Sequence, residues 1–198
     1  MRPWGRATEA EYRARRLLAH DLLAGVPLHD AWRVFLPGGA RPCSMPEVRS
    51  VARALVHDGS LGLVVPALFG IRRRLGAWLG WDGPVDGQRP SVSMVSRVPE
   101  RTLADSLVPP GSRDGPFSVV YVAADEAMSE IRNATVEAYL VSTLRPVTGG
   151  CELLFAVHVL PVGIWTRPYL ALIAPFRRLF VYPALLKGMH QAWQGAKS

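Results

Sequence analysis

The sequence predicts a single α+β domain in which an antiparallel sheet is closed by one long C-terminal helix. The second half of the chain contains strand-like runs rich in β-branched and aromatic residues, turn residues join the last two of these runs, and the C-terminal stretch is apolar at helical spacing. A chain of 198 residues, 49% hydrophobic and 20% charged, has the size and composition of one folded domain. We divide it into four segments, 1–60, 61–90, 91–164 and 165–198.

The N-terminal segment is expected to contain two helices and one strand. Helices are predicted over 7–24 and 44–58, because Thr8 and Ser44 each stand three residues before a glutamate, which is the spacing of a capping box. Between them, an alternation with more polar or smaller neighbours predicts the first strand, in which every second residue is Leu28, Asp30, Trp32, Val34 and Leu36.

The middle of the chain is expected to change from helix to sheet. Residues 68–80 are apolar at steps of three and four, which predicts an amphipathic helix, and the Gly-, Pro- and Asp-rich stretch 82–90 predicts a mobile loop. The charged segments 125–126 and 130–133 are expected to form a loop or helical turn with solvated charges. Four strands are predicted, over 91–98, 117–123, 135–144 and 152–160.

The last two strands are expected to form a hairpin, followed by the closing helix. Residues 145–150 have turn chemistry throughout. The helix is predicted over 169–193 and is expected to be bent or broken at Pro175 and Pro183, since a proline inside a helix costs about 3 kcal/mol.

The hairpin predicts two chemically different faces. A symmetric turn places Leu140 opposite Phe155 on an almost wholly apolar face, and Glu137 opposite His158 on a mixed face. In a sheet covered by a helix on one side, the apolar face meets the helix and the mixed face meets water, so Glu137 and His158 are expected to be exposed. If the mixed face is instead turned inward, the carboxylate and the imidazole can act as an acid–base pair.

Charge, cysteine content and hydropathy exclude several classes of protein. The net charge is +7, but the basic residues are scattered in pairs and triplets, so we expect no nucleic-acid partner. Cys43 and Cys151 lack metal-site spacing and are expected to be reduced and packed, with no metal and no cofactor. The apolar runs are too short to cross a bilayer and the N-terminus lacks the apolar segment of a secretory signal, which predicts a cytoplasmic protein without stable membrane insertion.

The motifs of common enzyme classes are absent. The chain has no G-x-S-x-G elbow, no Walker loop, no His-Glu-x-x-His and no dinucleotide fingerprint after a predicted strand. These absences argue against a common hydrolase, a nucleotide-binding protein and a zinc protease.

Three runs carry a resemblance to a known group of proteins. They are 117–126, 130–137 and the segment from Trp165 to Tyr169 that leads into 174–178. The sequence resembles an uncharacterised bacterial domain-of-unknown-function family that is similar to the START-like, helix-grip superfamily, also called SRPBCC. The resemblance covers about residues 62–193 and marks a fold more than a chemistry.

The resemblance implies a curved antiparallel sheet wrapped around a long C-terminal helix, with an apolar cavity between them. Members of the superfamily include lipid carriers, hormone receptors, aromatases and cyclases of polyketide pathways, and oxygenase subunits. They share no universal catalytic residues. The iron–sulfur and iron ligand patterns of the oxygenase members are missing from this sequence.

The leading functional hypothesis is an enzyme of the cyclase or isomerase kind that binds a hydrophobic, polyketide-like substrate and acts by folding it and by acid–base assistance. The candidate catalytic residues are Glu137, His158 and Tyr139, with Tyr121 as another possible hydroxyl donor. The candidate ligand-binding residues are Trp78, Tyr121, Phe155, Trp165 and Tyr169.

Two alternatives stay open at this point. The same cavity without a reactive group would serve a non-catalytic carrier or sensor of a lipid or other small molecule. A lesser alternative is docking to a membrane surface, in which Arg177, Arg178 and Lys187 meet anionic headgroups while neighbouring apolar side chains of the helix insert. We expect those apolar side chains, which include Leu179 and Phe180, to cover the sheet instead. A homodimer is a further expectation.

Overall fold

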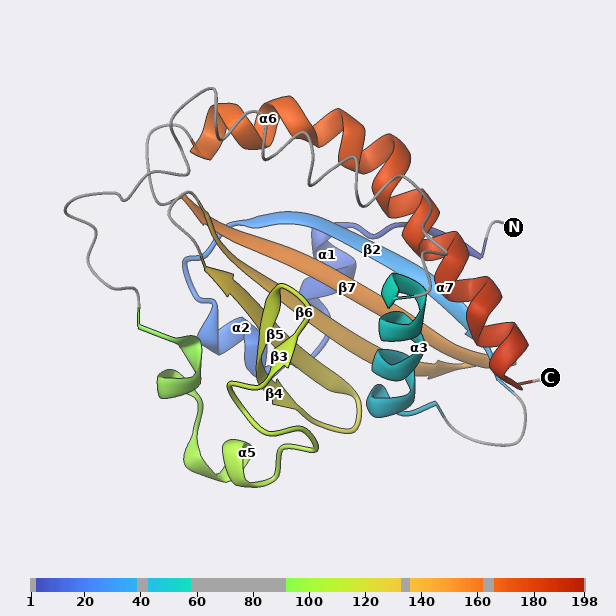
Figure 1. The fold of residues 1–198 in the computed structure, drawn as a ribbon, viewed down its shortest axis with the longest axis horizontal. Coiled ribbons are helices and arrows are strands. Elements are labelled where there is room, and N and C mark those ends of the chain that lie inside the picture. Colours follow the sequence, from blue (N-terminus) through green and yellow to red (C-terminus); the bar gives the residue numbers. More distant parts are fainter. Residues whose placement is uncertain (1–2, 39–42, 58–91, 133–135, 162–165, 198) are drawn as a thin grey trace.

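The computed structural model describes residues 3–38, 43–57, 92–132, 136–161 and 166–197, which form a curved, open antiparallel sheet with helices on both faces (Figure 1). Within these residues the sheet has seven strands in the order β1-β2-β7-β6-β5-β4-β3. The strands are β1 (Trp4–Arg6), β2 (Leu28–Pro37), β3 (Arg113–Asp114), β4 (Phe117–Val122), β5 (Glu126–Arg132), β6 (Val136–Val147) and β7 (Gly150–Pro161). The predicted fold class, an α+β helix-grip arrangement with extra N-terminal helices, is confirmed.

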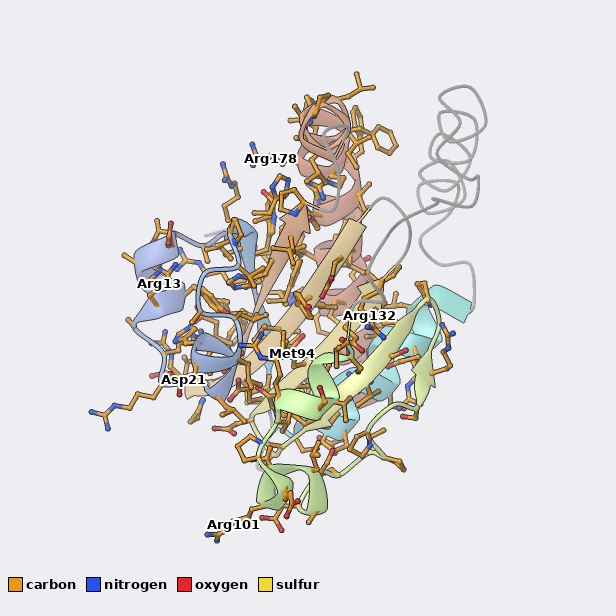
Figure 2. All side chains as sticks on the ribbon, turned by 90° about the vertical axis from the view of Figure 1, so that its left-hand side faces the viewer. Arg13, Asp21, Met94, Arg101, Arg132 and Arg178 are labelled. Carbon is orange, nitrogen blue, oxygen red and sulfur yellow. A yellow bond between two sulfur atoms is a disulfide. The ribbon has the colours of Figure 1, made fainter. Side chains whose placement is uncertain are left out.

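The helices form two groups on opposite sides of the sheet. One group is α1 (Glu9–Arg13), α2 (Leu18–Leu22), the 3-10 helix η1 (Met94–Arg97) and α5 (Glu100–Ala104). The other is α3 (Met45–His57), α6 (Thr166–Phe176), the π-helix η2 (Arg177–Val181) and α7 (Tyr182–Lys197). Figure 2 shows α1 and α2, which carry Arg13 and Asp21, on one side of the strands. We call the two sides of the sheet the α2 face and the α7 face.

Each face has its own hydrophobic core. The core on the α7 face includes Trp32, Leu153, Phe155, Tyr182, Leu186, Met189 and Trp193. The core on the α2 face includes Tyr12, Leu22, Met94, Tyr121, Met128, Tyr139 and Leu154. The prediction that the mixed face meets water is therefore wrong. The prediction assumed helices on one face of the sheet only, whereas α1, α2 and η1 cover the second face.

The N-terminal helix begins as predicted but ends early. The Thr8 capping box is present, with the Glu11 amide donating to Thr8 Oγ1 at 3.1 Å and the Thr8 amide donating to the Glu11 carboxylate at 2.7 Å. The predicted helix over 7–24 is divided into α1 and α2, because the amides of Leu18 and Ala19 donate to the buried carboxylate of Glu126. A long-range hydrogen-bond acceptor thus starts a second helix.

Two segments in the middle of the chain differ from their predicted structure. Residues predicted as a strand over 91–98 contain η1, whose Met94 amide donates to the Glu130 carboxylate at 2.9 Å. The segment predicted as a solvated loop is strand β5, and its carboxylates Glu126 and Glu130 are buried. Sequence reasoning took these charges for surface groups, whereas both have hydrogen-bond donors from the layer that covers them.

The β6–β7 hairpin is confirmed, with a shorter turn and a different register. Only Thr148 and Gly149 stand between the last pair of the strands, and Gly149 adopts φ +81°, a conformation that favours glycine. Leu144 is opposite Leu153 instead of Cys151. The predicted register is wrong by two residues, because the turn is centred between Thr148 and Gly149, one residue later than predicted. Each side chain still points to the predicted face, since the shift is an even number.

The C-terminal helix runs as one continuous helical path through α6, η2 and α7 (Figure 1). Pro175 lies at the end of α6 and Pro183 in the first turn of α7, with the π-helical turn between them. The predicted irregularity at the two prolines is confirmed.

The predicted strands over 28–36 and 117–123 and the helix over 44–58 correspond to β2, β4 and α3. The predicted helix over 68–80 and loop over 82–90 lie outside the described residues.

Cys43 and Cys151 form a disulfide, so the prediction of two reduced cysteines is wrong. They are 108 residues apart in sequence, and only the pairing of β2 with β7 brings the start of β7 close to the chain that follows β2. Among the described residues, no helix combines the length and hydropathy that crossing a membrane requires.

Candidate functional site

The predicted catalytic residues lie together on the α2 face. Tyr139 is directly opposite His158 in the β6–β7 pairing, and its hydroxyl donates to the carboxylate of Glu137. Glu137 itself is opposite Leu160, so the predicted cross-strand pair of Glu137 and His158 is wrong. All three are buried, and Glu137 and His158 are only 8% and 3% exposed. Burial and the hydrogen bond to Glu137 raise the pKa of Tyr139, so its hydroxyl stays protonated.

His158 is held by hydrogen bonds at both ring nitrogens. Nδ1 lies 3.0 Å from the carbonyl oxygen of Val26, which can only accept, so Nδ1 carries the proton. Nε2 therefore accepts from the Tyr12 hydroxyl at 3.1 Å. Burial lowers the pKa of His158, and burial raises that of Tyr12, so both groups are neutral at neutral pH. In this arrangement His158 has no ring nitrogen left for a substrate.

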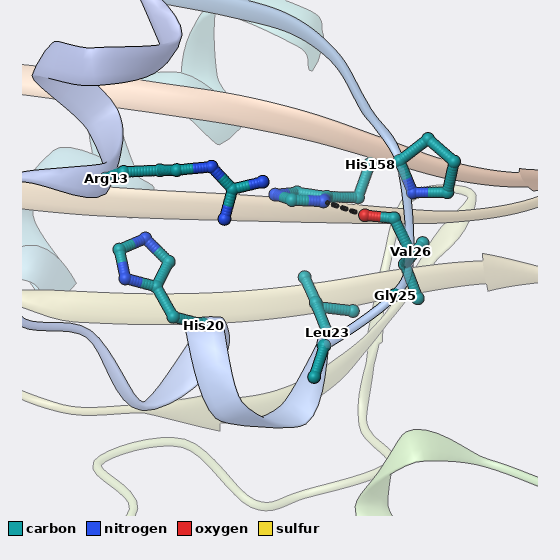
Figure 3. Close-up of a pocket in the computed structure, with 8 residues that line it drawn as sticks. Arg13, His20, Leu23, Gly25, Val26 and His158 are labelled. Carbon is teal, nitrogen blue, oxygen red and sulfur yellow. Dashed lines mark hydrogen bonds between the residues drawn. The ribbon is translucent and has the colours of Figure 1, made fainter.

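A pocket of about 230 Å³ opens beside His158 on the α2 face (Figure 3). Its polar walls are the side chains of Arg13, His20 and His158. The rest of the lining comes from the end of α2 and the connection to β2, namely Leu23, Ala24, Gly25, Val26 and Pro27. The predicted residue His158 thus lines a pocket, but on the face opposite the C-terminal helix.

The other buried acids of the α2 face hold its covering layer. The Glu126 carboxylate accepts from the amides of Leu18 and Ala19 and, at 2.6 Å, from the hydroxyl of Tyr121. Tyr121, which was predicted to bind ligand, is 1% exposed and is used in this contact. The pKa of Tyr121 is raised, first by burial and second by its interaction with Glu126. Tyr121 therefore anchors α2 and lies on the opposite side of the sheet from the C-terminal helix.

A second ionic group lies on the α7 face, between the sheet and the C-terminal helix. The Asp30 side chain is fully buried and accepts from Arg178 Nε at 2.9 Å, from Arg177 Nη2 at 3.2 Å and from the Tyr182 hydroxyl at 3.5 Å. His29 Nε2 is 3.8 Å from the same carboxylate. We call these five residues the Asp30 cluster. The pKa of His29 is lowered, first by burial and second by the nearby charge of Arg177. Burial raises the pKa of Tyr182 to about 12.

Besides Nε2 of His29, two buried donors at the Asp30 cluster have no hydrogen-bond partner in the described structure. They are Trp32 Nε1 and Arg177 Nε. Both side chains flank the ring of Tyr182, with the Trp32 ring centroid at 5.0 Å and the Arg177 guanidinium carbon at 6.0 Å from its centroid. A buried donor left unpaired costs roughly 1–3 kcal/mol, so such groups are where an acceptor atom of a ligand is expected.

A row of residues across the sheet leads to the Asp30 cluster. Ser129, Leu140, Val157 and Asp30 stand side by side on β5, β6, β7 and β2. On this α7 face, Ala138, Leu140 and Val157 are only half-buried, whereas Tyr139 and Val141 on the α2 face of β6 are fully buried. Ala138, Leu140 and Val157 therefore form a half-buried apolar strip that ends at a buried ionic cluster.

The structure distributes the remaining predicted ligand-binding residues differently. Phe155 is on the α7 face, with its ring centroid 5.8 Å from that of Tyr182. Tyr169 lies in α6, but its side chain is outside the description, as are Trp78 and Trp165. Only Phe155 is therefore placed beside the Asp30 cluster.

Sequence reasoning missed Asp30 as a site residue, although a signal was present. Asp30 continues the alternate positions of β2 that carry Trp32, Val34 and Leu36 of the α7-face core, so the alternation assigns it to that core. The lesser alternative of membrane docking placed Arg177 and Arg178 at lipid headgroups, but both are bound to Asp30. The expectation that Leu179 and Phe180 cover the sheet is also wrong, because they are 68% and 57% exposed.

Comparison with known proteins identifies a family but no activity. The model of a family described as "Protein of unknown function (DUF2867)" matches residues 22–184. No curated protein and no solved structure matches the chain significantly. Among the described residues, no group of three or more His, Cys, Asp or Glu side chains is arranged to hold a metal ion.

Proposed function

This chain belongs to the DUF2867 family, and we propose that it binds an amphipathic small molecule between the sheet and the C-terminal helix. The apolar body of the ligand lies on the half-buried strip, and its acidic group is held at the Asp30 cluster. The row from Leu140 through Val157 to Asp30 carries this proposal, because it joins accessible apolar surface to buried charge.

The charge balance of the Asp30 cluster supports an acidic group. The cluster contains one carboxylate and two guanidinium groups, and the lowered pKa of His29 keeps that imidazole neutral. Within the described residues, one positive charge of the cluster therefore lacks a carboxylate partner. A ligand carboxylate would compensate this charge and accept from Arg177 Nε and Trp32 Nε1. The resemblance to the START-like superfamily supports the same location for a ligand.

The test is a binding titration with decanoate as an acidic amphipathic probe and decanol as its uncharged analogue. We expect saturable binding of decanoate, and about tenfold weaker binding to Arg177→Gln, because a charge-assisted hydrogen bond is lost. Arg178 still pairs with Asp30 in that variant, which protects the fold. The control is Arg101→Gln, which removes the same charge from a side chain that is 94% exposed. Equal affinity for decanoate and decanol, or equal losses in both variants, would contradict the proposal.

The alternative candidate is an enzyme of the cyclase or isomerase kind that acts on a polyketide-like substrate at the same place. The Tyr182 hydroxyl at Asp30 favours it, since a buried, protonated phenol can donate a hydrogen bond or a proton to a bound substrate. Glu137, Tyr139 and His158 lie on the other face and would not touch a ligand bound there. Mass spectrometry of the co-purified ligand before and after incubation separates the two. A constant mass and structure favours the carrier or sensor, and conversion that Tyr182→Phe abolishes favours the enzyme.

The cytoplasmic location and the homodimer expected from the sequence are separate questions, each with its own test. The Cys43–Cys151 disulfide argues against the cytoplasm, because such bonds persist mainly in oxidising compartments. Alkylating free thiols at the moment of cell lysis decides the point: modified Cys43 and Cys151 favour the cytoplasm. Light scattering after size exclusion tests the homodimer. The pairing of Arg177 and Arg178 with Asp30 argues against membrane docking, whereas the exposure of Leu179 and Phe180 favours it. Absence of liposome flotation at low salt would remove this alternative.

A further inference from the structure

The polar lining of the pocket beside His158 is basic and titratable, without an acidic residue. Its charged and titratable lining residues are Arg13, His20 and His158, and none of its eight lining residues is acidic. It lies on the α2 face, separated by the sheet from the half-buried strip and the Asp30 cluster. Its chemistry is therefore independent of the proposed amphipathic ligand.

His20 offers the pocket a ring nitrogen, Nε2, which is a donor in the tautomer that carries the proton there. Its Nε2 is buried and has no hydrogen-bond partner in the described structure. The imidazole stands edge-on to the ring of Tyr12, with the ring centroids 4.8 Å apart. Because Tyr12 is fully buried and also donates to His158, the His20 and His158 rings are positioned by one common side chain. The orientation of the free nitrogen is thus set before any ligand arrives.

Arg13 supplies the charge of the pocket. Its side chain extends from α1 across the opening toward His158 (Figure 3). Only Nε is engaged within the described residues, by Glu9 at 2.7 Å, and that pair is exposed at 57% and 59%, so it contributes little stability. The terminal nitrogens of the guanidinium can therefore meet an anion without breaking a strong interaction.

Nearby carboxylates do not occupy the pocket. Glu9 is paired with Arg13 outside the lining, and Glu126 accepts from two backbone amides and from Tyr121. Burial lowers the pKa of both His20 and His158, so both imidazoles are neutral at neutral pH. His20 then contributes hydrogen bonding, the His158 ring contributes shape, and Arg13 contributes the charge. The backbone of Gly25 and Val26 closes the remaining wall.

We propose that this pocket is a second binding site, for the oxyanion group of a small acidic metabolite, held by the guanidinium of Arg13 and by Nε2 of His20. The volume of about 230 Å³ is below the roughly 300–1,000 Å³ of sites for drug-sized ligands, so the ligand is a small acid or the phosphate or carboxylate end of a larger molecule.

The experiment is an NMR titration of the full chain that follows the imidazole resonances of His20 and His158, with inorganic phosphate in one arm and acetate in the other. We expect saturable shifts in the millimolar range or below in at least one arm, which identifies the preferred oxyanion. Arg13→Gln should weaken binding about tenfold, and His20→Asn should weaken it as well. The control is Arg16→Gln, which removes an exposed arginine that does not line the pocket.

Two results would overturn the proposal. One is the absence of saturable shifts with both anions. The other is an equal loss of affinity in Arg13→Gln and Arg16→Gln, which would mean that net charge alone attracts the anion. Because Arg13 is largely exposed, Arg13→Gln keeps the fold and the test remains decisive even if His20→Asn does not fold. Decanoate binding by Arg13→Gln should be unchanged, which separates this site from the proposed site on the α7 face.

Discussion

The two faces of the sheet are buried to different degrees. On the α2 face of β6, the side chains of Glu137, Tyr139, Val141 and Thr143 are all buried although two of them are polar and one is charged. On the α7 face of the same strand, Ala138, Leu140 and Ser142 are only half-buried. Between residues 138 and 142 of β6 the more apolar face is thus the less covered one, whereas Leu144 further along the α7 face is buried. Apolar surface that the protein leaves partly accessible is the surface on which a ligand is expected.

The two covering layers are also attached by different interactions. The α2 layer is held by buried carboxylates that accept from backbone amides, Glu126 at α2 and Glu130 at η1. The α7 layer is held by the charges of the Asp30 cluster, and the start of β7 is tied by the disulfide to the chain before α3. A buried carboxylate with several amide donors is specific in geometry, which fixes the position of the layer that it holds.

The sharpest way to break this comparison is to remove the anchor of the α2 layer. Glu126→Ala leaves the amides of Leu18 and Ala19 and the hydroxyl of Tyr121 without their acceptor, and we expect a loss of about 3 kcal/mol or more in the free energy of unfolding. Urea unfolding measures it. The control Asp125→Ala changes an exposed neighbour and should cost less than about 0.5 kcal/mol. Similar losses in the two variants would mean that Glu126 is not an anchor.

A matched pair of leucines compares the cores of the two faces directly. Leu154, on the α2 face, is 1% exposed, whereas Leu140, on the α7 face, is half-buried. We expect Leu154→Ala to cost about 3 kcal/mol and Leu140→Ala about 1 kcal/mol, because less apolar area is lost at Leu140. Thermal or urea unfolding of both variants checks this.

The same pair also tests function. Leu140→Ala should weaken decanoate binding and Leu154→Ala should not. The reverse order of stability losses would contradict the assignment of the α7 face as the less covered one.

Sequence patterns predicted the elements that depend on local chemistry. The Thr8 capping box, the alternation of β2 and the hairpin are local features, and each is present. The predictions failed where a distant residue decides. The Glu126 carboxylate divides the first helix and the Glu130 carboxylate starts η1, and no local pattern reveals that these acids are buried.

The site that we propose follows the resemblance in its location and departs from the sequence analysis in its residues. The resemblance implied a ligand between the sheet and the closing helix, and Phe155 does lie there, but the predicted acid–base residues face the other way. Parity along β6 and β7 assigned each side chain to the correct face; the number of covering layers could not be deduced from it. Asp30 could have been found from its position in an apolar alternation, whereas its pairing with Arg177 required the tertiary structure.

The smallest effect that we expect is a dependence of stability on pH, which comes from the buried His158 of the α2 face. The folded state holds His158 neutral, with Nδ1 donating to Val26 and Nε2 accepting from Tyr12, and burial lowers its pKa below the ordinary value of 6.5. The unfolded chain therefore binds a proton more readily, so stability is full above about pH 6.5 and falls as the pH drops toward the folded pKa. His158→Gln should flatten this decline between about pH 7 and 5, as measured by urea unfolding at several pH values.

The flattening should be partial, because burial also lowers the pKa of His20 and of His29, and these two groups keep their own contributions to the slope. The matched control is His29→Gln, which removes a half-buried imidazole from the α7 side. If His158 is the more strongly buried group, its replacement changes the slope more than that of His29. If the pH dependence of the unfolding free energy is the same in His158→Gln and the unchanged chain, burial does not hold His158 neutral in the folded state.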